Sequence, residues 1–285
     1  MGILYGVLAA VFWGVGDFFI TLLTRRIGTR WALLSIQLLS LLAWLLLLFG
    51  RPVPLVFSAA LGSILLATAA CHVLGLALVY RAFEIGNLAI VSPISSAFAI
   101  VTAVLSLLSG ERPPTLVLAG SVLLMVGVTL ATRGESTVDA PRASFRGVPE
   151  ALGSALAFGT MFWLFYFYIE PRLGYVVPLI SLKTLAVLAS AMALVLSRSK
   201  ERAGPIRPGP TLVLLAVGAA IADTAAWFAY IEGMRTAYAT VVTALASLFS
   251  AVTVLLAWRF FRERLAAHQW AGVAVILLGI LLVSV

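Results

Sequence analysis

The stretch that decides the fold runs from residue 95 to residue 130 and reads SSAFAIVTAVLSLLSGERPPTLVLAGSVLLMVGVTL. A second version, ASLFSAVTVLLAWRFFRERLAAHQWAGVAVILLGILL, occupies residues 246–282. Matches before the Glu-Arg pair are 151 residues apart: Ser96 with Ser247, Phe98 with Phe249, Val101 with Val252, and Thr102 with Thr253. Matches from that pair onward are 152 residues apart: Glu111 with Glu263, Gly120 with Gly272, and Gly127 with Gly279. An offset this constant indicates an internal repeat that divides the chain into two halves.

The composition places both halves in lipid. Of the 285 residues, 62% are hydrophobic and 11% are charged, and the mean hydropathy is +1.12. A soluble domain has about a quarter of its residues charged, and its core could not hold this apolar excess. The net charge of +8 comes from basic residues scattered through short connectors, which excludes the continuous basic face of a nucleic-acid-binding protein. Cys71 is the only cysteine, so a disulfide within the chain and a cysteine-based metal site are also excluded.

Apolar windows of about 20 residues, the length that crosses a bilayer, predict an all-α integral membrane protein with ten transmembrane helices. The windows are 3–23, 31–49, 55–79, 88–108, 115–132, 148–169, 175–196, 211–230, 238–258 and 269–285. The predicted organisation is a first five-helix repeat at 1–132, a polar linker at 133–147 and a second five-helix repeat at 148–285. Since five is odd, the repeats cross the membrane in opposite directions, and inverted repeats place a substrate site between them near the midplane.

Among the ionisable side chains inside the predicted spans are Asp17, His72, Lys183 and Asp223. A charge there costs roughly 2.5–3.5 kcal/mol on insertion scales, so each is a candidate for substrate binding or ion coupling. A carboxylate withdrawn from water would also hold a proton near neutral pH, as a proton-coupled carrier requires. Structural alternatives stay open: Asp17 reaching interfacial water, Lys183 and Asp223 forming a buried ion pair, and His72 serving as a hydrogen-bonded packing residue.

Aromatic and hydroxyl side chains complete the set of candidate site residues. Those expected to line a midplane cavity or to offer it polar groups are Trp13, Tyr80, Ser92, Ser96, Trp163, Trp227 and Tyr230. Large ring faces would suit an apolar or aromatic solute, or would bind a cation, whereas anchoring at the lipid interface is the alternative for the tryptophans. The two serines flank Pro93, whose missing backbone donor frees a carbonyl within the fourth window.

Several short motifs resemble one family of transporters. They are Phe12-Trp13-Gly14, Tyr80-Arg81-Ala82, Val91-Ser92-Pro93, and Gly110-Glu111-Arg112 with its downstream glycines. Together with two sets of five helices, they resemble the drug/metabolite transporter superfamily, EamA type, over nearly the whole chain; the second half keeps Glu263-Arg264 but lacks the proline. The resemblance implies secondary transport of metabolites, commonly amino acids or other small organic solutes, often outward and often coupled to protons.

The predicted function is therefore secondary transport of a small, amino-acid-like solute by alternating access, with export and proton coupling as expectations. The alternatives are a multidrug or aromatic-cation exporter and a flippase for a lipid-linked substrate. No nucleophile–base pair, metal-ligand spacing or phosphate-binding loop stands out in the sequence, so neither an enzyme nor a cofactor or metal site is predicted. The expected partners are the substrate and membrane lipid; one chain with two halves suffices as a monomer, and a homodimer stays open.

The expected location is the inner (cytoplasmic) membrane of the cell, as a multi-pass protein. Loops after odd-numbered windows hold fourteen of the nineteen Lys and Arg residues. The positive-inside rule would put those loops in the cytoplasm and both termini outside. The resemblance to the family implies the opposite orientation, with both termini inside.

Overall fold

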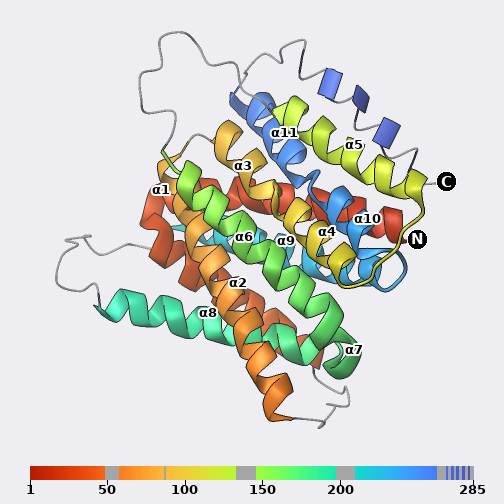
Figure 1. Ribbon diagram of the computed structural model, residues 1–285. Coiled ribbons are helices and arrows are strands. Elements are labelled where there is room, and N and C mark those ends of the chain that lie inside the picture. Colours follow the sequence, from red (N-terminus) through yellow and green to blue (C-terminus); the bar gives the residue numbers. More distant parts are fainter. Residues whose placement is uncertain are drawn as a thin grey trace.

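The computed structural model describes residues 1–48, 58–86, 88–132, 146–196 and 209–261, and parts of 268–282. The described residues are helical, with no β-strand among them (Figure 1). The elements are α1 (Gly2–Leu48), α2 (Ala59–Ile85), α3 (Leu88–Ser96), α4 (Phe98–Leu108), α5 (Thr115–Thr132), α6 (Val148–Leu164), the π-helix η2 (Phe165–Ile169), α7 (Glu170–Leu173), α8 (Val176–Leu196), α9 (Pro210–Met234), α10 (Ala239–Ala246) and α11 (Phe249–Phe261).

Helix α1 consists of two helices that meet at Gly28. The backbone of Gly28 has φ 78° and ψ 160°, a left-handed conformation that glycine adopts without the steric cost a side chain would add. The two helices contain the first two predicted windows, 3–23 and 31–49, apart from residue 49, which lies outside the described residues. The connector predicted between them is therefore reduced to a single non-helical residue.

The distribution of side chains is that of a protein surrounded by lipid. Five of the described helices are long and apolar enough to cross a membrane: Gly2–Leu48, Ala59–Ile85, Val148–Leu173, Val176–Leu196 and Pro210–Met234. Leu46, Leu108 and Leu214 are more than two-thirds exposed on the outside, whereas Lys183 and Gln37 are fully buried. Apolar groups outward and polar groups inward suit a bilayer. The total of ten crossings stays a prediction.

Two helices are interrupted at equivalent places in the repeat. Ala97 separates α3 from α4, and Ser247 with Leu248 separates α10 from α11. At each break the backbone forms a hydrogen bond between residues three apart: Ala97 N donates to Ile94 O, and Leu248 N donates to Leu245 O, both at 3.1 Å. Donors and acceptors are both 151 residues apart. A tight turn inside a helix often marks a functional hinge or a strained sequence, so the two breaks are matched candidate hinges.

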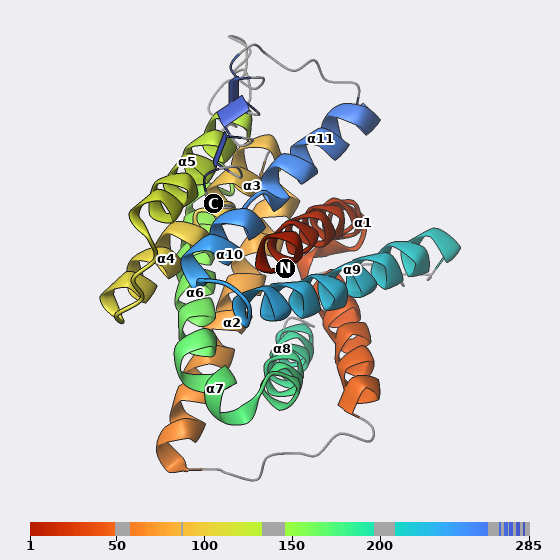
Figure 2. The same ribbon diagram turned by 90° about the vertical axis from the view of Figure 1, so that its right-hand side faces the viewer.

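The halves interlock through two matched helix crossings. Thr102 Oγ1 of α4 donates to Gly159 O of α6 at 3.1 Å, and Thr253 Oγ1 of α11 donates to Gly14 O of α1 at 3.3 Å. Both glycines allow close approach, since an added Cβ would lie 2.7 Å from Phe249 O at Gly14 and 2.8 Å from Phe98 O at Gly159. Figure 2 shows α11 beside α1 and α4 beside α6. The fourth segment of each half thus packs on the first helix of the other.

Candidate substrate-binding site

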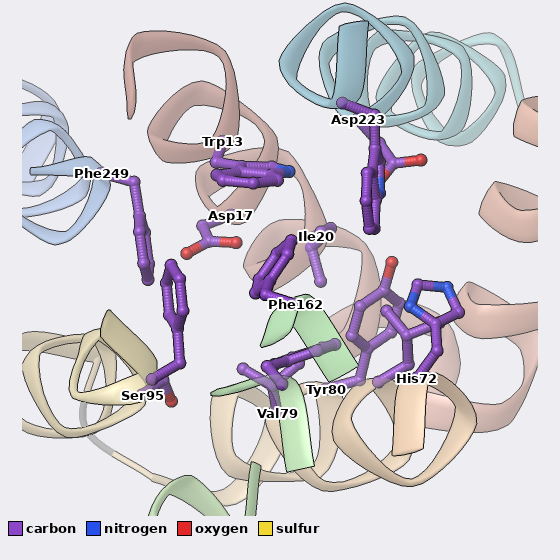
Figure 3. Close-up of a pocket in the computed structure, with 14 residues that line it drawn as sticks. Trp13, Asp17, Ile20, His72, Val79, Tyr80, Ser95, Phe162, Asp223 and Phe249 are labelled. Carbon is purple, nitrogen blue, oxygen red and sulfur yellow. The ribbon is translucent and has the colours of Figure 1, made fainter. Parts of the chain in front are cut away.

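A cavity of about 90 Å³ lies between the halves, and half of its fourteen lining residues are aromatic (Figure 3). Helices α1, α2, α3 and α4 contribute from the first half, and α6, α9 and α11 from the second. The lining residues are Trp13, Asp17, Ile20, His72, Leu76, Val79, Tyr80, Ser95, Phe98, Phe158, Phe162, Asp223, Trp227 and Phe249.

Helical spacing brings these side chains together. Trp13 and Asp17 of α1 are four residues apart, as are Asp223 and Trp227 of α9, so each pair lies on one helix face. His72 and Tyr80 of α2 are eight residues apart and share a face in the same way. Of the sequence-predicted site residues, Asp17, Asp223, Trp13, His72, Tyr80 and Trp227 line the cavity.

Asp17 presents an unpaired carboxylate to the cavity. Its Oδ2 is buried and has no hydrogen-bond partner in the part of the chain that the structure describes. Figure 3 shows the carboxylate among the rings of Trp13, Phe162 and Phe249. An isolated ionised carboxylate in such surroundings is costly, so the group favours a proton or a positively charged occupant.

Asp223, in contrast, is already neutralised. Lys183 Nζ of α8 donates to Asp223 Oδ2 at 2.7 Å, and Ser40 Oγ of α1 donates to the same oxygen at 2.9 Å. The Lys183 side chain is fully buried and that of Asp223 is 15% exposed. The predicted ion pair between the two is therefore present. Lys183 stands behind the cavity wall, with Nζ 6.0 Å from the ring centroid of Trp227.

His72 lines the cavity without a hydrogen bond from the described residues to either ring nitrogen. Its ring centroid lies 6.2 Å from that of Phe158 and 5.9 Å from that of Trp227. The alternative in which His72 is a hydrogen-bonded packing residue therefore agrees with the ring contacts of His72. It does not agree with the ring nitrogens, which have no hydrogen-bond partner among the described residues. Both nitrogens are consequently free to meet a polar group of an occupant.

The aromatic wall is centred on Trp13. Its ring centroid lies 5.6 Å from Phe162, 6.1 Å from Trp227 and 5.2 Å from Tyr230, which sits behind the lining. Elsewhere in the wall Phe98 and Phe249, equivalent residues of the two halves, stack on each other at 6.1 Å with 20° between their planes. Equivalent residues of the two halves therefore meet in the wall of the cavity.

The remaining predicted site residues lie outside the lining. Trp163 Nε1 donates to Ser109 Oγ at 2.7 Å, away from the cavity. Ser92 and Ser96 are buried in α3, and their neighbour Ser95 faces the cavity instead. The sequence-based site also omitted Phe98 and Phe249, although their matched positions in the repeat were a usable signal. Among the described residues, no three His, Cys, Asp or Glu side chains gather as a metal site.

A helical membrane protein with a half-aromatic, charged cavity between two interlocked halves has the architecture of a membrane transporter. The chain belongs to the EamA-like transporter family, whose model matches residues 1–133 and 146–285, and through it to the drug/metabolite transporter superfamily. Its fold is similar to a solved structure described as "Crystal structure of protein", with a TM-score of 0.73 and 14% identity over 100% of this chain and 98% of the other. That likeness shows the fold alone. No curated protein matches the chain.

Proposed function

We propose that the protein is a secondary transporter that carries a small organic solute across the inner membrane, outward, by alternating access in exchange for protons. The observation that carries this proposal is the unpaired Asp17 carboxylate in an aromatic cavity between the halves. Asp223 already has Lys183 as its partner, so Asp17 is the carboxylate left to bind a proton and a solute in turn. Binding either one relieves the cost of its isolated charge.

The proposed cycle uses the two matched hinges. Bending at Ala97 and at Ser247–Leu248 would move α3 and α4 against α11 and α10, opening the cavity to one side while closing it to the other. In a carrier built from inverted repeats the two halves exchange conformations between the two end states, which is how rocking exposes one site to each side in turn. Asp17 would release its proton on one side and receive it on the other.

The size of the cavity favours a small solute over a drug or a lipid-linked substrate. Drug-sized ligands occupy sites of about 300–1,000 Å³, whereas this cavity measures about 90 Å³. Amino-acid-like solutes and simple amines both carry an ammonium group that Asp17 can hold. A multidrug exporter or a flippase would require the cavity to widen several-fold.

The test is the proton flux of purified protein in liposomes, read by a pH-sensitive dye inside them under an imposed pH gradient, with amino acids, small amines and sugars as challenges. We expect at least one class to evoke a proton flux that Asp17→Asn removes and that Asp139→Asn, in the predicted linker, retains. Loss of the flux in both variants would point to damage from any lost carboxylate. A flux that survives Asp17→Asn, or the absence of a flux in the folded wild type under every gradient, would overturn the proposal.

A further inference from the structure

We infer that the substrate is a small organic monocation, an amine or quaternary ammonium compound without a carboxylate. The inference rests on the proposed transport function and narrows it to one chemical class. It follows from the balance of charge in the cavity, from the chemistry of its walls and from its size.

The charges that face the cavity leave one negative group unmatched. Asp223 is paired with Lys183 at 2.7 Å and also accepts from Ser40. Asp17 Oδ2 has no partner among the described residues, and none of the lining residues is Lys or Arg. An occupant with one positive charge completes this balance, and a buried charge is tolerated when it is paired.

The aromatic walls of the cavity, like the Asp17 carboxylate, suit a cation. Trp13 and Phe162 flank the Asp17 carboxylate (Figure 3), and aromatic faces attract ammonium groups most strongly when water is excluded. The protein already uses this contact once, because Lys183 Nζ lies 6.0 Å from the centroid of the Trp227 ring. A substrate ammonium beside Asp17 would meet Trp13 in the same manner.

A zwitterionic amino acid fits this cavity poorly. Its ammonium group would find Asp17, but its carboxylate would meet aromatic rings, a neutralised Asp223 and His72, with no lining Lys or Arg among the described residues. An unpaired carboxylate buried among rings carries the same penalty that Asp17 itself does. The cavity of about 90 Å³ also restricts the cation to a few heavy atoms.

The exchange that follows is balanced in charge. As the cation binds, the O–H bond of the protonated Asp17 carboxyl breaks and the proton leaves to water on the side to which the cavity is open. One positive charge enters as one leaves. The other titratable groups facing this space are His72 and Tyr80 of α2 and Asp223 of α9, the last held by Lys183 of α8.

Binding of four compounds of similar size tests the class directly: propylamine, alanine, propionate and 1-propanol, by calorimetry on the full chain in detergent. We expect propylamine to bind, and the other three to bind at least about tenfold more weakly. Asp17→Asn should weaken the binding of propylamine by about tenfold or more, whereas Asp17→Glu and Asp139→Asn should retain the wild-type affinity. Thermal unfolding of each variant verifies that it is folded.

The inference is overturned by alanine or propionate binding as tightly as propylamine, by an unchanged propylamine affinity in folded Asp17→Asn, or by no binding of propylamine to the wild type. These outcomes are separable from failure of the proposed function. Alanine-driven proton flux that depends on Asp17 would retain the proton-coupled transporter and reject the cation class. Propylamine binding without any propylamine-driven proton flux into or out of liposomes would support the cation site and reject transport as proposed.

Discussion

Asp17 and Asp223 carry the same side chain in the same cavity, but their neighbouring residues give the two carboxylates different surroundings. Asp223 is held by Lys183 and Ser40, from two other helical segments. Asp17 Oδ2 faces a largely aromatic cavity and has no hydrogen-bond partner among the described residues. The first carboxylate therefore joins three helical segments, and the second is the one that the proposed function assigns to binding a proton and a solute.

Removing Lys183 alone should unfold the protein more easily than removing the whole ion pair. Lys183→Met leaves Asp223, whose side chain is 15% exposed, beside Ser40 without its counter-ion, at a cost of up to about 3–5 kcal/mol. Lys183→Met with Asp223→Leu should recover most of that loss, because replacing a buried pair by apolar groups is often neutral. The measurement is thermal unfolding in detergent. Arg235→Met, which removes a half-exposed cation 3.5 Å from Glu170, serves as control and should shift stability by about 1 kcal/mol or less.

Two glycines of α1 provide a matched pair of substitutions. Gly14→Ala would place a Cβ 2.7 Å from the backbone oxygen of Phe249, which a side-chain movement cannot relieve. Gly16→Ala would meet Ala222 Cβ at an ordinary 3.5 Å. We expect the first to lower stability by about 1–3 kcal/mol and the second to leave it unchanged or slightly raised. Equal melting temperatures for the two variants would contradict the close crossing of α1 and α11.

The charged members of the site were predictable from the sequence, but their partners were not. Asp17, His72, Lys183 and Asp223 stand out because ionisable groups are rare in apolar windows. Which carboxylate is paired depends on how α1, α8 and α9 pack, and spacing along one helix does not contain that information. The sequence left the pair as one of two alternatives, and the structure shows the bond.

At the scale of elements, Glu111 links the connector after α4 to the start of α10. Its carboxylate accepts from the backbone N–H of Ala239 at 2.6 Å and of Thr240 at 3.1 Å, and from the Thr240 hydroxyl. Tyr238, at the N-cap position, makes no side-chain capping bond. A residue 128 positions away thus satisfies the free amides of the first turn.

Glu111→Gln should loosen the start of α10. The amide side chain keeps one acceptor and loses the charge that favours a helix N-terminus, at a cost of about 1 kcal/mol. Hydrogen exchange at Ala239 and Thr240 should then accelerate by about fivefold, since exchange follows local opening. Glu232→Gln, which removes the charge of a carboxylate that accepts from Arg235, should leave those amides unchanged. Unchanged exchange in Glu111→Gln would show that α10 does not depend on this cap.

Hydropathy located the helices better than it described their shape. Every predicted window contains helix among its described residues, and most of those residues are helical. The interruptions at Ala97 and Ser247–Leu248 were not predicted, because a window average is the same for a straight and a broken apolar helix. The turn at Gly28 was predicted as a connector of several residues, since its flanking Arg25, Arg26 and Arg30 are polar although they are helical.

At the scale of the whole molecule, each half depends on the other for its packing. Gly14 of the first half contacts α11, and Gly159 of the second contacts α4. The repeat found in the sequence implied two similar halves. It could not reveal that the fourth segment of each half packs on the first helix of the other half. The family match at 1–133 and 146–285 is consistent with a joint between the halves near the middle of the chain.

Separately made halves should therefore assemble with each other. We expect fragments 1–139 and 140–285, cut in the predicted linker, to co-purify when expressed together, because the α4–α6 and α1–α11 crossings join them without the linker. Size-exclusion chromatography with a tag on one fragment measures this. Co-purification should fail when Gly14→Leu and Gly159→Leu are combined, and a stable first fragment on its own would contradict the interdependence.

The aromatic wall has a last consequence, which concerns light. Trp13 and Trp227 both face the cavity, with ring centroids 6.1 Å apart, and His72 lies 5.9 Å from the second indole. A solute that enters the cavity would contact the indole of Trp13 or Trp227. A change of charge on the imidazole of His72 would alter the surroundings of Trp227. The protein thus contains its own optical reporter of occupancy, and replacing the other five tryptophans by phenylalanine would leave a signal from the cavity alone.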